Sequence, residues 1–387
     1  MIVEKYKDFK DSDIYVELIM RYNNIHYLLN KHLYYFIFNS QDKTYYVLKD
    51  FDTNGIVYTH NKKIWFHYYK KDLSKVYDLT LCHYLQTNKV IEFKNSIVYN
   101  QSIHKFSDNK IIPLTILIQP FQTWLHQIKH IKEFDSTFHY YNTKTLYTMY
   151  RMEQKGIVLK DNKTIYSDYN LYTKTGRISN TSMGYNLCAL KKNSIEREVI
   201  VSNKDKLFKI DFEAFHLQII AKLIKFKVTE NLHLHLGKQY FDKEELTEEE
   251  YKKTKELNFK YLFGGIPEEL NEIEYFRRTN EYIDKIWKEV NKNGYIESVI
   301  TKRKIFKQEN KNTFFNYLLQ LMEQEICIYI LDKLYSDFLQ DSKDSLLLYV
   351  YDEIVFDINT DSEEKIKTYF KDFRFKTKEG KNYNELF

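Results

Sequence analysis

The segment Leu346–Asp357 limits the possible folds of this chain more than any other. It reads LLLYVYDEIVFD, in which two runs of strand-forming residues, Leu346–Val350 and Ile354–Phe356, flank the pair Asp352-Glu353. This pattern predicts a β-hairpin with two carboxylates at its tight turn. A carboxylate next to buried strands is costly unless it is paired or binds a metal ion. Read alone, the segment fits an ordinary acidic turn equally well.

Composition sets broad limits on the class of protein. A chain of 387 residues can bury a large core and is expected to form two or three domains. The net charge of +5 permits a polyanionic partner but does not require one. Cys82, Cys188 and Cys327 lie far apart without metal-ligand spacing, which indicates a reducing compartment. With no signal-like N-terminus and no apolar run of membrane-spanning length, we expect a cytoplasmic protein.

The first part of the chain alternates strand and helix patterns. His32–Phe38 and Thr44–Leu48 flank a polar turn and predict a β-hairpin. Val76–Leu85 resembles the start of a helix, which gives an α/β layout. The section Leu114–Gly156 is predicted to be mostly helical, with a last helix from Leu146 that ends at the glycine.

The second part begins with a strand that runs into an acidic residue. Lys206–Ile210 predicts a strand that leads directly to Asp211, and a helix is expected from Phe215 to about Ile224. A long helix is predicted over Asn312–Leu334, just before the hairpin that carries Asp352.

A helix between these elements has an unusual face. Thr247 opens it with a capping box, since a glutamate follows three residues later, and the helix is expected to end at Phe263 before two glycines. Tyr251, Lys255, Phe259 and Phe263 recur every four residues and therefore share one face. A purely structural interpretation buries the rings and lets the lysine reach solvent. A functional interpretation directs one cation and three rings to a ligand.

Taken together, these stretches resemble the motifs of the family A DNA polymerases, the bacterial DNA polymerase I family, over residues 146–387 and in the same order. Six segments carry the resemblance: Thr175-Gly-Arg177 with Asn186-Leu187 is similar to T-G-R…N-L, Asp211–Gln218 to D-Y-S-Q-I-E-L-R, Lys255–Gly264 to K-A-I-N-F-G-L-I-Y-G, Gly294–Thr301 with Arg303 to G-Y-V-E-T, Asn312–Gln320 to N-A-P-M-Q, and Tyr351-Asp-Glu353 to H-D-E.

The resemblance implies a mixed α/β fold with an exonuclease-like α/β domain followed by a right-hand polymerase. The expected parts are a degenerate 3′–5′ exonuclease-like domain over residues 1–113, and a helical connector with a vestigial thumb over 114–174. A palm with an antiparallel sheet is expected over 175–223 and 294–387, and helical fingers over 224–293.

The resemblance also implies a nucleotidyltransferase, a DNA-directed DNA polymerase acting in DNA replication, with primer-template DNA and dNTPs as partners. Two Mg²⁺ ions, replaceable by Mn²⁺, are expected on Asp211, Asp352 and the backbone carbonyl of Phe212, with Glu353 as a neighbouring support. Lys255 is expected to bind the triphosphate. The remaining substrate contacts implied are Arg177, Phe212, His216, Tyr251, Phe259, Phe263, Asn312, Asn316 and Tyr351. Arg177, with Lys191 and Lys192, is expected to face phosphates, and Phe259 to stack on the incoming nucleotide.

Several positions depart from the family pattern. Tyr251 stands where the family has an arginine, Asn316 where a glutamine is expected, and Tyr351 where a histidine precedes the catalytic aspartate. His216 replaces the acid that screens the sugar 2′-position, and Phe263 replaces its tyrosine partner. The last two changes fit each other, because a phenylalanine cannot make the hydrogen bond that the acid would need.

Two larger regions also depart from it. Ile157–Lys174 occupies the place of a long helical thumb, so the thumb is predicted to be nearly absent. In the exonuclease-like region, His60-Asn61 resembles the start of H-N-L-K-Y, but Trp65 stands where an aspartate is expected. Asp78 is interpreted as a helix cap. Without clustered carboxylates a two-metal nuclease site cannot form, so we expect no proofreading.

Three functional alternatives stay open at this point. The first is a monomeric DNA polymerase without proofreading, with a separate processivity partner. The second is a polymerase of the same architecture with relaxed sugar selectivity or an RNA product, which His216 and Phe263 leave open. The third is a catalytically weak or inactive polymerase-derived DNA-binding protein, which Tyr251 and the missing thumb favour and the retained Asp211, Asp352 and Lys255 oppose.

Overall fold

The computed structural model describes residues 4–21, 26–89, 134–182 and 194–387, together with 118–119, 121–123, 125–126, 187 and 190–191. The chain divides into two compact units, Met1–Gln154 and Lys155–Phe387. The described part of the predicted connector up to residue 154 therefore belongs to the first unit. Among the described residues, no helix combines the length and the apolar character that crossing a membrane requires.

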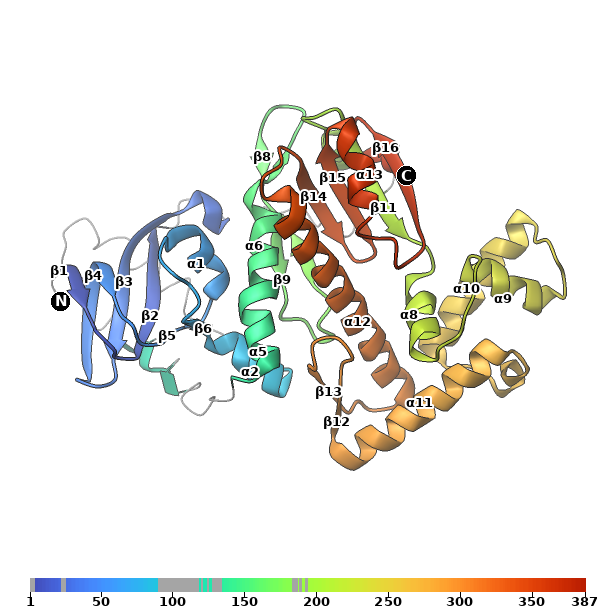
Figure 1. The fold of residues 1–387 in the computed structure, drawn as a ribbon, viewed down its shortest axis with the longest axis horizontal. Helices are drawn as coiled ribbons and strands as arrows, with labels where there is room; N and C mark the ends of the chain where they lie inside the picture. The colour runs from blue at the N-terminus through green and yellow to red at the C-terminus, as the bar shows by residue number, and fades with distance from the viewer. Residues whose placement is uncertain are drawn as a thin grey trace. The chain divides into compact units, whose positions relative to one another are not determined.

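The first unit is built on a six-stranded mixed sheet in the order β1-β4-β3-β2-β5-β6 (Figure 1). Its strands are β1 Glu4–Asp8, β2 Ile14–Arg21, β3 Lys31–Asn39, β4 Thr44–Asp52, β5 Val57–Thr59 and β6 Val76–Asp78. Its helices are α1 Lys62–Tyr68, α2 Leu79–Thr87, α5 Ser136–Tyr140 and α6 Leu146–Gln154, with a π-helical turn at Tyr141–Thr145 and a 3₁₀ turn at Tyr27–Leu29. The predicted hairpin, β3 with β4, is confirmed.

One helix prediction in this unit is wrong at its start. Val76–Asp78 forms strand β6, which pairs with β5, and the helix begins only at Leu79. Asp78 sets this boundary, because its carboxylate accepts hydrogen bonds from the backbone N–H groups of Leu81 at 2.9 Å and Lys62 at 2.8 Å. The interpretation of Asp78 as a helix cap is confirmed.

The second unit contains a four-stranded antiparallel sheet in the order β14-β15-β11-β16. The strands are β11 Lys206–Phe212, β14 Ser345–Val350, β15 Glu353–Ile358 and β16 Phe375–Gly380. β14 and β15 form the predicted hairpin. The turn consists of Tyr351 and Asp352, and Glu353 is already the first residue of β15. The register places Glu353 and Lys376 on either side of Asp211.

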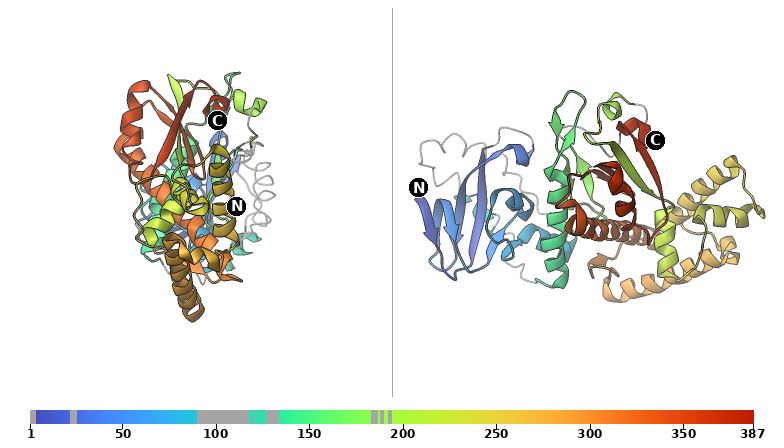
Figure 2. Two further views of the ribbon diagram at one scale, coloured as in Figure 1. Left: turned by 90° about the vertical axis from the view of Figure 1, so that its right-hand side faces the viewer. Right: turned by 45° about the horizontal axis from the view of Figure 1, so that its top comes forward.

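Helices extend from this sheet and form most of the rest of the unit. The long helix α12 leads from the sheet towards α11 in Figure 1, and the turned view in Figure 2 shows α9, α10 and α11 as a helical lobe away from the sheet. The helices are α7 Ile195–Glu198, α8 Phe215–Leu223, α9 Leu232–Phe241, α10 Glu248–Gly264, α11 Glu274–Asn293, α12 Lys311–Leu334 and α13 Glu363–Lys367. Short turns of helix lie at Glu268–Glu272, Tyr335–Leu339, Thr360–Ser362 and Tyr383–Leu386.

The predicted capping box of α10 is confirmed. The Thr247 side chain accepts from the Glu250 N–H, and the Glu250 carboxylate accepts from the Thr247 N–H at 2.9 Å. The predicted starts and ends of α8, α10 and α12 agree with the structure within one residue. Local sequence signals therefore locate the helices that surround the palm-like sheet.

The region of the predicted vestigial thumb contains short strands. They are β7 Ile157–Val158, β8 Thr164–Ile165 and β9 Asp168–Asn170, and β10 Ser179–Thr181 follows them. Two strands later in the chain, β12 Tyr295–Glu297 and β13 Lys304–Phe306, form a separate ribbon. Residues 157–174 contain no helix. Gly156 takes the left-handed conformation, with φ +67°, that ends the preceding helix.

Candidate active site

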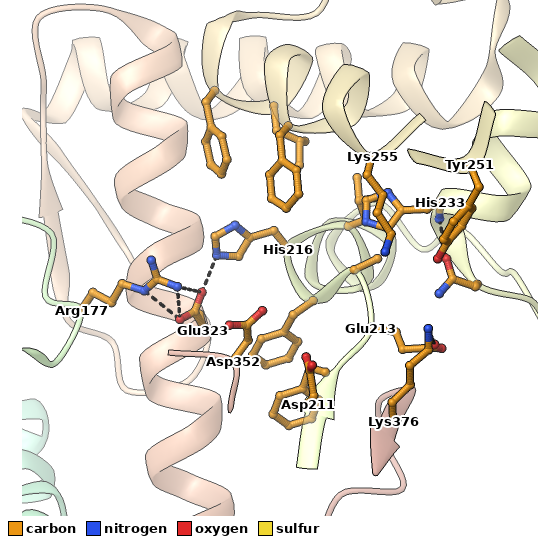
Figure 3. Close-up of a pocket in the computed structure, with 18 residues that line it drawn as sticks. Arg177, Asp211, Glu213, His216, His233, Tyr251, Lys255, Glu323, Asp352 and Lys376 are labelled. Atoms are coloured by element: carbon orange, nitrogen blue, oxygen red, sulfur yellow. Dashed lines mark hydrogen bonds and ion pairs between the residues drawn. The ribbon is translucent and has the colours of Figure 1, made fainter. Parts of the chain in front are cut away.

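Asp211 and Asp352 meet at the end of the four-stranded sheet. Asp211 is near the end of β11, and Asp352 is in the turn between β14 and β15. The backbone N–H of Phe212 donates to the Asp352 carbonyl oxygen at 3.2 Å, which fixes the two segments side by side. Both carboxylates line a cleft of about 350 Å³ (Figure 3). The sheet register therefore brings together two acids that are 141 positions apart in the chain, since 352 − 211 = 141.

The surroundings of Asp352 favour a bound cation. Burial raises the pKa of its carboxyl to about 6, and the negative charges of Glu323 and Asp211 add to this effect. A divalent ion would relieve both the burial and the repulsion, and carboxylate oxygens are the ligands that Mg²⁺ prefers. Among the described residues, no three acidic, histidine or cysteine side chains are arranged as a complete metal site. The expected protein ligands are fewer, namely two carboxylates and the Phe212 carbonyl, and all three residues line the cleft.

The predicted face of α10 lines the same cleft. Tyr251, Lys255, Phe259 and Phe263 all border it. Phe259 and Phe263 are 51% and 37% exposed, and their rings stack with centroids 6.0 Å apart. The interpretation that these two rings are buried in the core is therefore wrong. The Lys255 amino group lies 4.7 Å from the centre of the Tyr251 ring. The helix presents a cation and exposed rings to the two carboxylates.

His216 and Phe263 lie in contact, as the paired departures from the family pattern suggest. Their rings pack edge to face with centroids 5.9 Å apart. The His216 Nε2 atom is 2.6 Å from an oxygen of Glu323, a residue of α12 that is only 1% exposed. Figure 3 shows Glu323 between His216 and Arg177. A carboxylate thus lies next to residue 216, but it comes from α12, whereas the family pattern has the acid at position 216 itself.

Arg177 is held by the same carboxylate. Its Nε and Nη2 atoms donate to Glu323 at 2.9 and 3.0 Å, a two-pronged contact that fixes the guanidinium plane. The guanidinium also lies 3.7 Å from the centre of the Tyr351 ring. Tyr351 has a φ of +61°, a strained conformation for a residue with a side chain, next to Asp352. The preceding Gly176 has a φ of +80°, and a Cβ there would meet Arg303 Nη1 at 2.8 Å.

Sequence reasoning missed Glu323 and a second group of residues on the other side of the cleft. His233 and Lys376 line this side together with Glu213. Burial, with a further effect of the Lys255 charge, lowers the pKa of His233 to about 4, so its imidazole is neutral at pH 7. The Lys376 amino group pairs with Glu213 at 3.0 Å. The one sequence signal for Glu323 is a polar run, Glu323–Glu325, with apolar residues directly before and after it on α12.

Several predicted substrate contacts lie elsewhere. The described residues that line the cleft do not include Asn312, Asn316 or Tyr351. The Asn312 side chain donates to the Gly264 carbonyl at 3.1 Å, at the end of α10, and Asn316 accepts from Gln320 at 2.8 Å. Lys191 is exposed. The predictions for Asn186 and Lys192 fall outside the described residues, as does Cys188.

Buried acids of the first unit are bound by other groups of the protein. Trp65 is fully buried, and its indole N–H donates to Thr59 Oγ1 at 3.0 Å. Glu17 of β2 pairs with His60 Nδ1 at 2.5 Å. Asp78 is buried as the α2 cap, and Lys63 pairs with Glu153 at 2.8 Å. Each of these acids therefore has a partner within the protein.

Comparisons with known proteins identify the family of this chain. No curated protein matches the sequence. Among solved structures, the chain is similar to the POL domain of Pol1 from M. smegmatis in complex with DNA primer-template and dNTP, with a TM-score of 0.70 and 13% identity over 97% of this chain and 96% of that one. The sequence model of DNA polymerase family A matches residues 119–379, which is more than half of the chain. The chain therefore belongs to DNA polymerase family A.

Proposed function

We propose that this chain, a DNA-directed DNA polymerase of family A, adds deoxynucleotides to a primer 3′ end by metal-assisted phosphoryl transfer at the cleft between the sheet and α10. The observation that carries this proposal is the meeting of Asp211 and Asp352 opposite Lys255 in one cleft. Nucleotide addition requires negative charge to be neutralised on both sides of the reacting phosphate.

The residues divide this task between them. Asp211, Asp352 and the Phe212 carbonyl would hold divalent ions, which supply charge neutralisation for the attacking hydroxyl and the leaving group when bound. Lys255 binds the triphosphate as a point charge from the helix side. Phe259, with its exposed ring, stacks on the incoming base or sugar. Glu353 supports Asp211 from the neighbouring strand.

One observation favours a second version of this function, a polymerase with relaxed sugar selectivity. At the position of the family's sugar-screening acid the chain carries His216, and the ring that it contacts, Phe263, has no hydroxyl group. The carboxylate next to His216 is that of Glu323, 2.6 Å from the His216 Nε2 atom, and α12 supplies it. The contacts that recognise the sugar edge therefore have a different chemistry here.

Primer extension with matched dNTP and rNTP pools tests both versions. The protein, a primer-template and Mg²⁺ should give template-directed products with dNTPs. Equal extension with rNTPs would favour the relaxed version, and extension with neither pool would overturn the proposal. A non-complementary nucleotide serves as the control for template direction.

We expect no proofreading. The motivation is that Trp65 fills the core where the family pattern has an aspartate, and that Glu17 and Asp78 are engaged by His60 and by backbone N–H groups. A primer with a mismatched 3′ end should stay intact when incubated with protein and Mg²⁺ but no nucleotide. Steady removal of the terminal nucleotide, faster than from a matched primer, would contradict this prediction.

We also expect distributive synthesis by the isolated protein. A helical thumb supplies sequence-independent contacts to DNA phosphates, and residues 157–174 form short strands instead. With fewer phosphate contacts the protein should dissociate after adding few nucleotides. The measurement is primer extension in the presence of a trap that captures released enzyme. Long products under the trap would refute the prediction, whereas short products that lengthen when a host extract is added would point to a processivity partner.

A further inference from the structure

A buried lysine lies behind the carboxylates of the cleft. Lys209 is two residues before Asp211 on β11, so both side chains leave the same face of the strand. Its Nζ atom is 3.6 Å from an oxygen of Asp211 and 3.7 Å from an oxygen of Glu353. The residue is 3% exposed, and it is not one of the described residues that line the cleft. Lys209 therefore reaches the carboxylates from inside the protein and does not touch the substrate.

The neighbours of Lys209 explain why a charge can be buried there. Asp211 and Glu353 are direct partners in the β11–β15 register, and like charges at such positions repel. The amino group between them offsets this repulsion. On another side, the ring of Phe387 lies 3.8 Å from Nζ and provides a favourable contact for a cation. Two carboxylates and one ring together compensate the loss of water around the ammonium.

We infer that Lys209 is a positioning residue for the polymerase reaction: a resident cation that holds Asp211 and Glu353 in place before any metal ion binds. The inference rests on the proposed function of Asp211 as a metal ligand. A fixed positive charge has a second consequence, because it repels a divalent ion at the same carboxylates. Lys209 therefore gives a preformed site at the expense of metal affinity. Its contact with Glu353 comes from inside the protein, and it keeps Glu353 in the place from which Glu353 supports Asp211.

The test measures metal binding without catalysis. Mn²⁺ is titrated into the protein alone, and the free ion is followed by electron paramagnetic resonance. Lys209→Met keeps the length and apolar part of the side chain and removes the charge. It should bind Mn²⁺ about fivefold more tightly than the parent, because one repulsive charge is lost near the ion. Lys209→Arg, which keeps the charge, should bind as the parent does.

Primer extension then separates positioning from a general loss of structure. Lys209→Met should turn over more slowly than the parent at saturating Mg²⁺, although its metal affinity is higher, since Asp211 and Glu353 are no longer aligned. A merely structural defect would lower the rate without tightening Mn²⁺ binding. Unchanged or weaker Mn²⁺ binding by a folded Lys209→Met variant would overturn the inference.

Two further variants keep the outcomes distinguishable. Asp211→Asn should lose this Mn²⁺ site, and if it binds as the parent does, the proposed metal site itself is wrong. If Lys209→Met does not fold, the same comparison is made on Glu353→Gln, which removes the repulsion between the two acids. Lys209→Met/Glu353→Gln should then bind Mn²⁺ about fivefold more tightly than Glu353→Gln alone, and equal binding would refute the inference.

Discussion

Replacing Asp211 or Asp352 by alanine should reduce primer extension by roughly three or more orders of magnitude, because the metal ions that they would hold carry most of the charge stabilisation. The two residues lie at the end of one sheet, where the Phe212 N–H binds the Asp352 carbonyl. Asp211→Asn and Asp352→Asn, which keep the shape but not the charge, should show nearly the same loss. The measurement is single-turnover extension at saturating Mg²⁺ and dNTP.

A matched control separates this effect from a general effect of losing an acid. Asp372 is an exposed carboxylate of the same unit that lines a different depression near the end of α12. Asp372→Ala should extend primers at the parental rate. Parental rates for Asp211→Ala and Asp352→Ala would show that the catalytic site lies elsewhere.

The second largest effect is expected for Lys255→Ala. Lys255 offers the cleft a positive charge from α10, and a hydrogen bond to a charged group is worth about 1.5–3 kcal/mol. We therefore expect kcat/KM for dNTP to fall by about 10- to 150-fold, with little change in the affinity for primer-template. Steady-state kinetics with varied dNTP, beside a DNA-binding titration, measure the two quantities.

Neighbouring lysines provide the controls for this experiment. Lys252 and Lys253 are exposed on α10 and, among the residues described, do not line the cleft. Lys252→Ala should leave kcat/KM for dNTP near the parental value. Lys255→Arg should recover part of the loss, because it restores the charge with a different shape. If Lys252→Ala and Lys255→Ala lose activity equally, the assigned triphosphate role of Lys255 is untenable.

Local features of this fold could be predicted from sequence because their causes are local. The hairpin around Asp352 follows from two short strand-forming runs, and α10 follows from a capping box at Thr247 and glycines after Phe263. The shared face of Tyr251 and Lys255 follows from helical spacing alone. The predicted helix start at Val76 was wrong, but the residue that sets the true start is only two positions away. Asp78 caps the helix, which begins directly after it.

The rest of the site depends on contacts between distant elements. Glu323 is one of three acids on α12, and only the packing of this helix brings it to Arg177 and His216. Lys376 reaches the cleft because β16 pairs with β11 in one particular register. Asn312, at the start of α12, donates to the Gly264 carbonyl at the end of α10, a contact that no spacing rule gives. Such residues become visible only when the tertiary arrangement is known.

The contacts of Glu323 with Arg177 and His216 have a consequence for how this protein can evolve. One buried carboxylate balances Arg177 and His216 together, so a change of any one of the three leaves an uncompensated group in a largely buried place. Substitutions at these positions are therefore expected not to be independent, because a change of one residue removes a contact that the other two need. We expect the three residues, drawn from a loop and two helices, to change together.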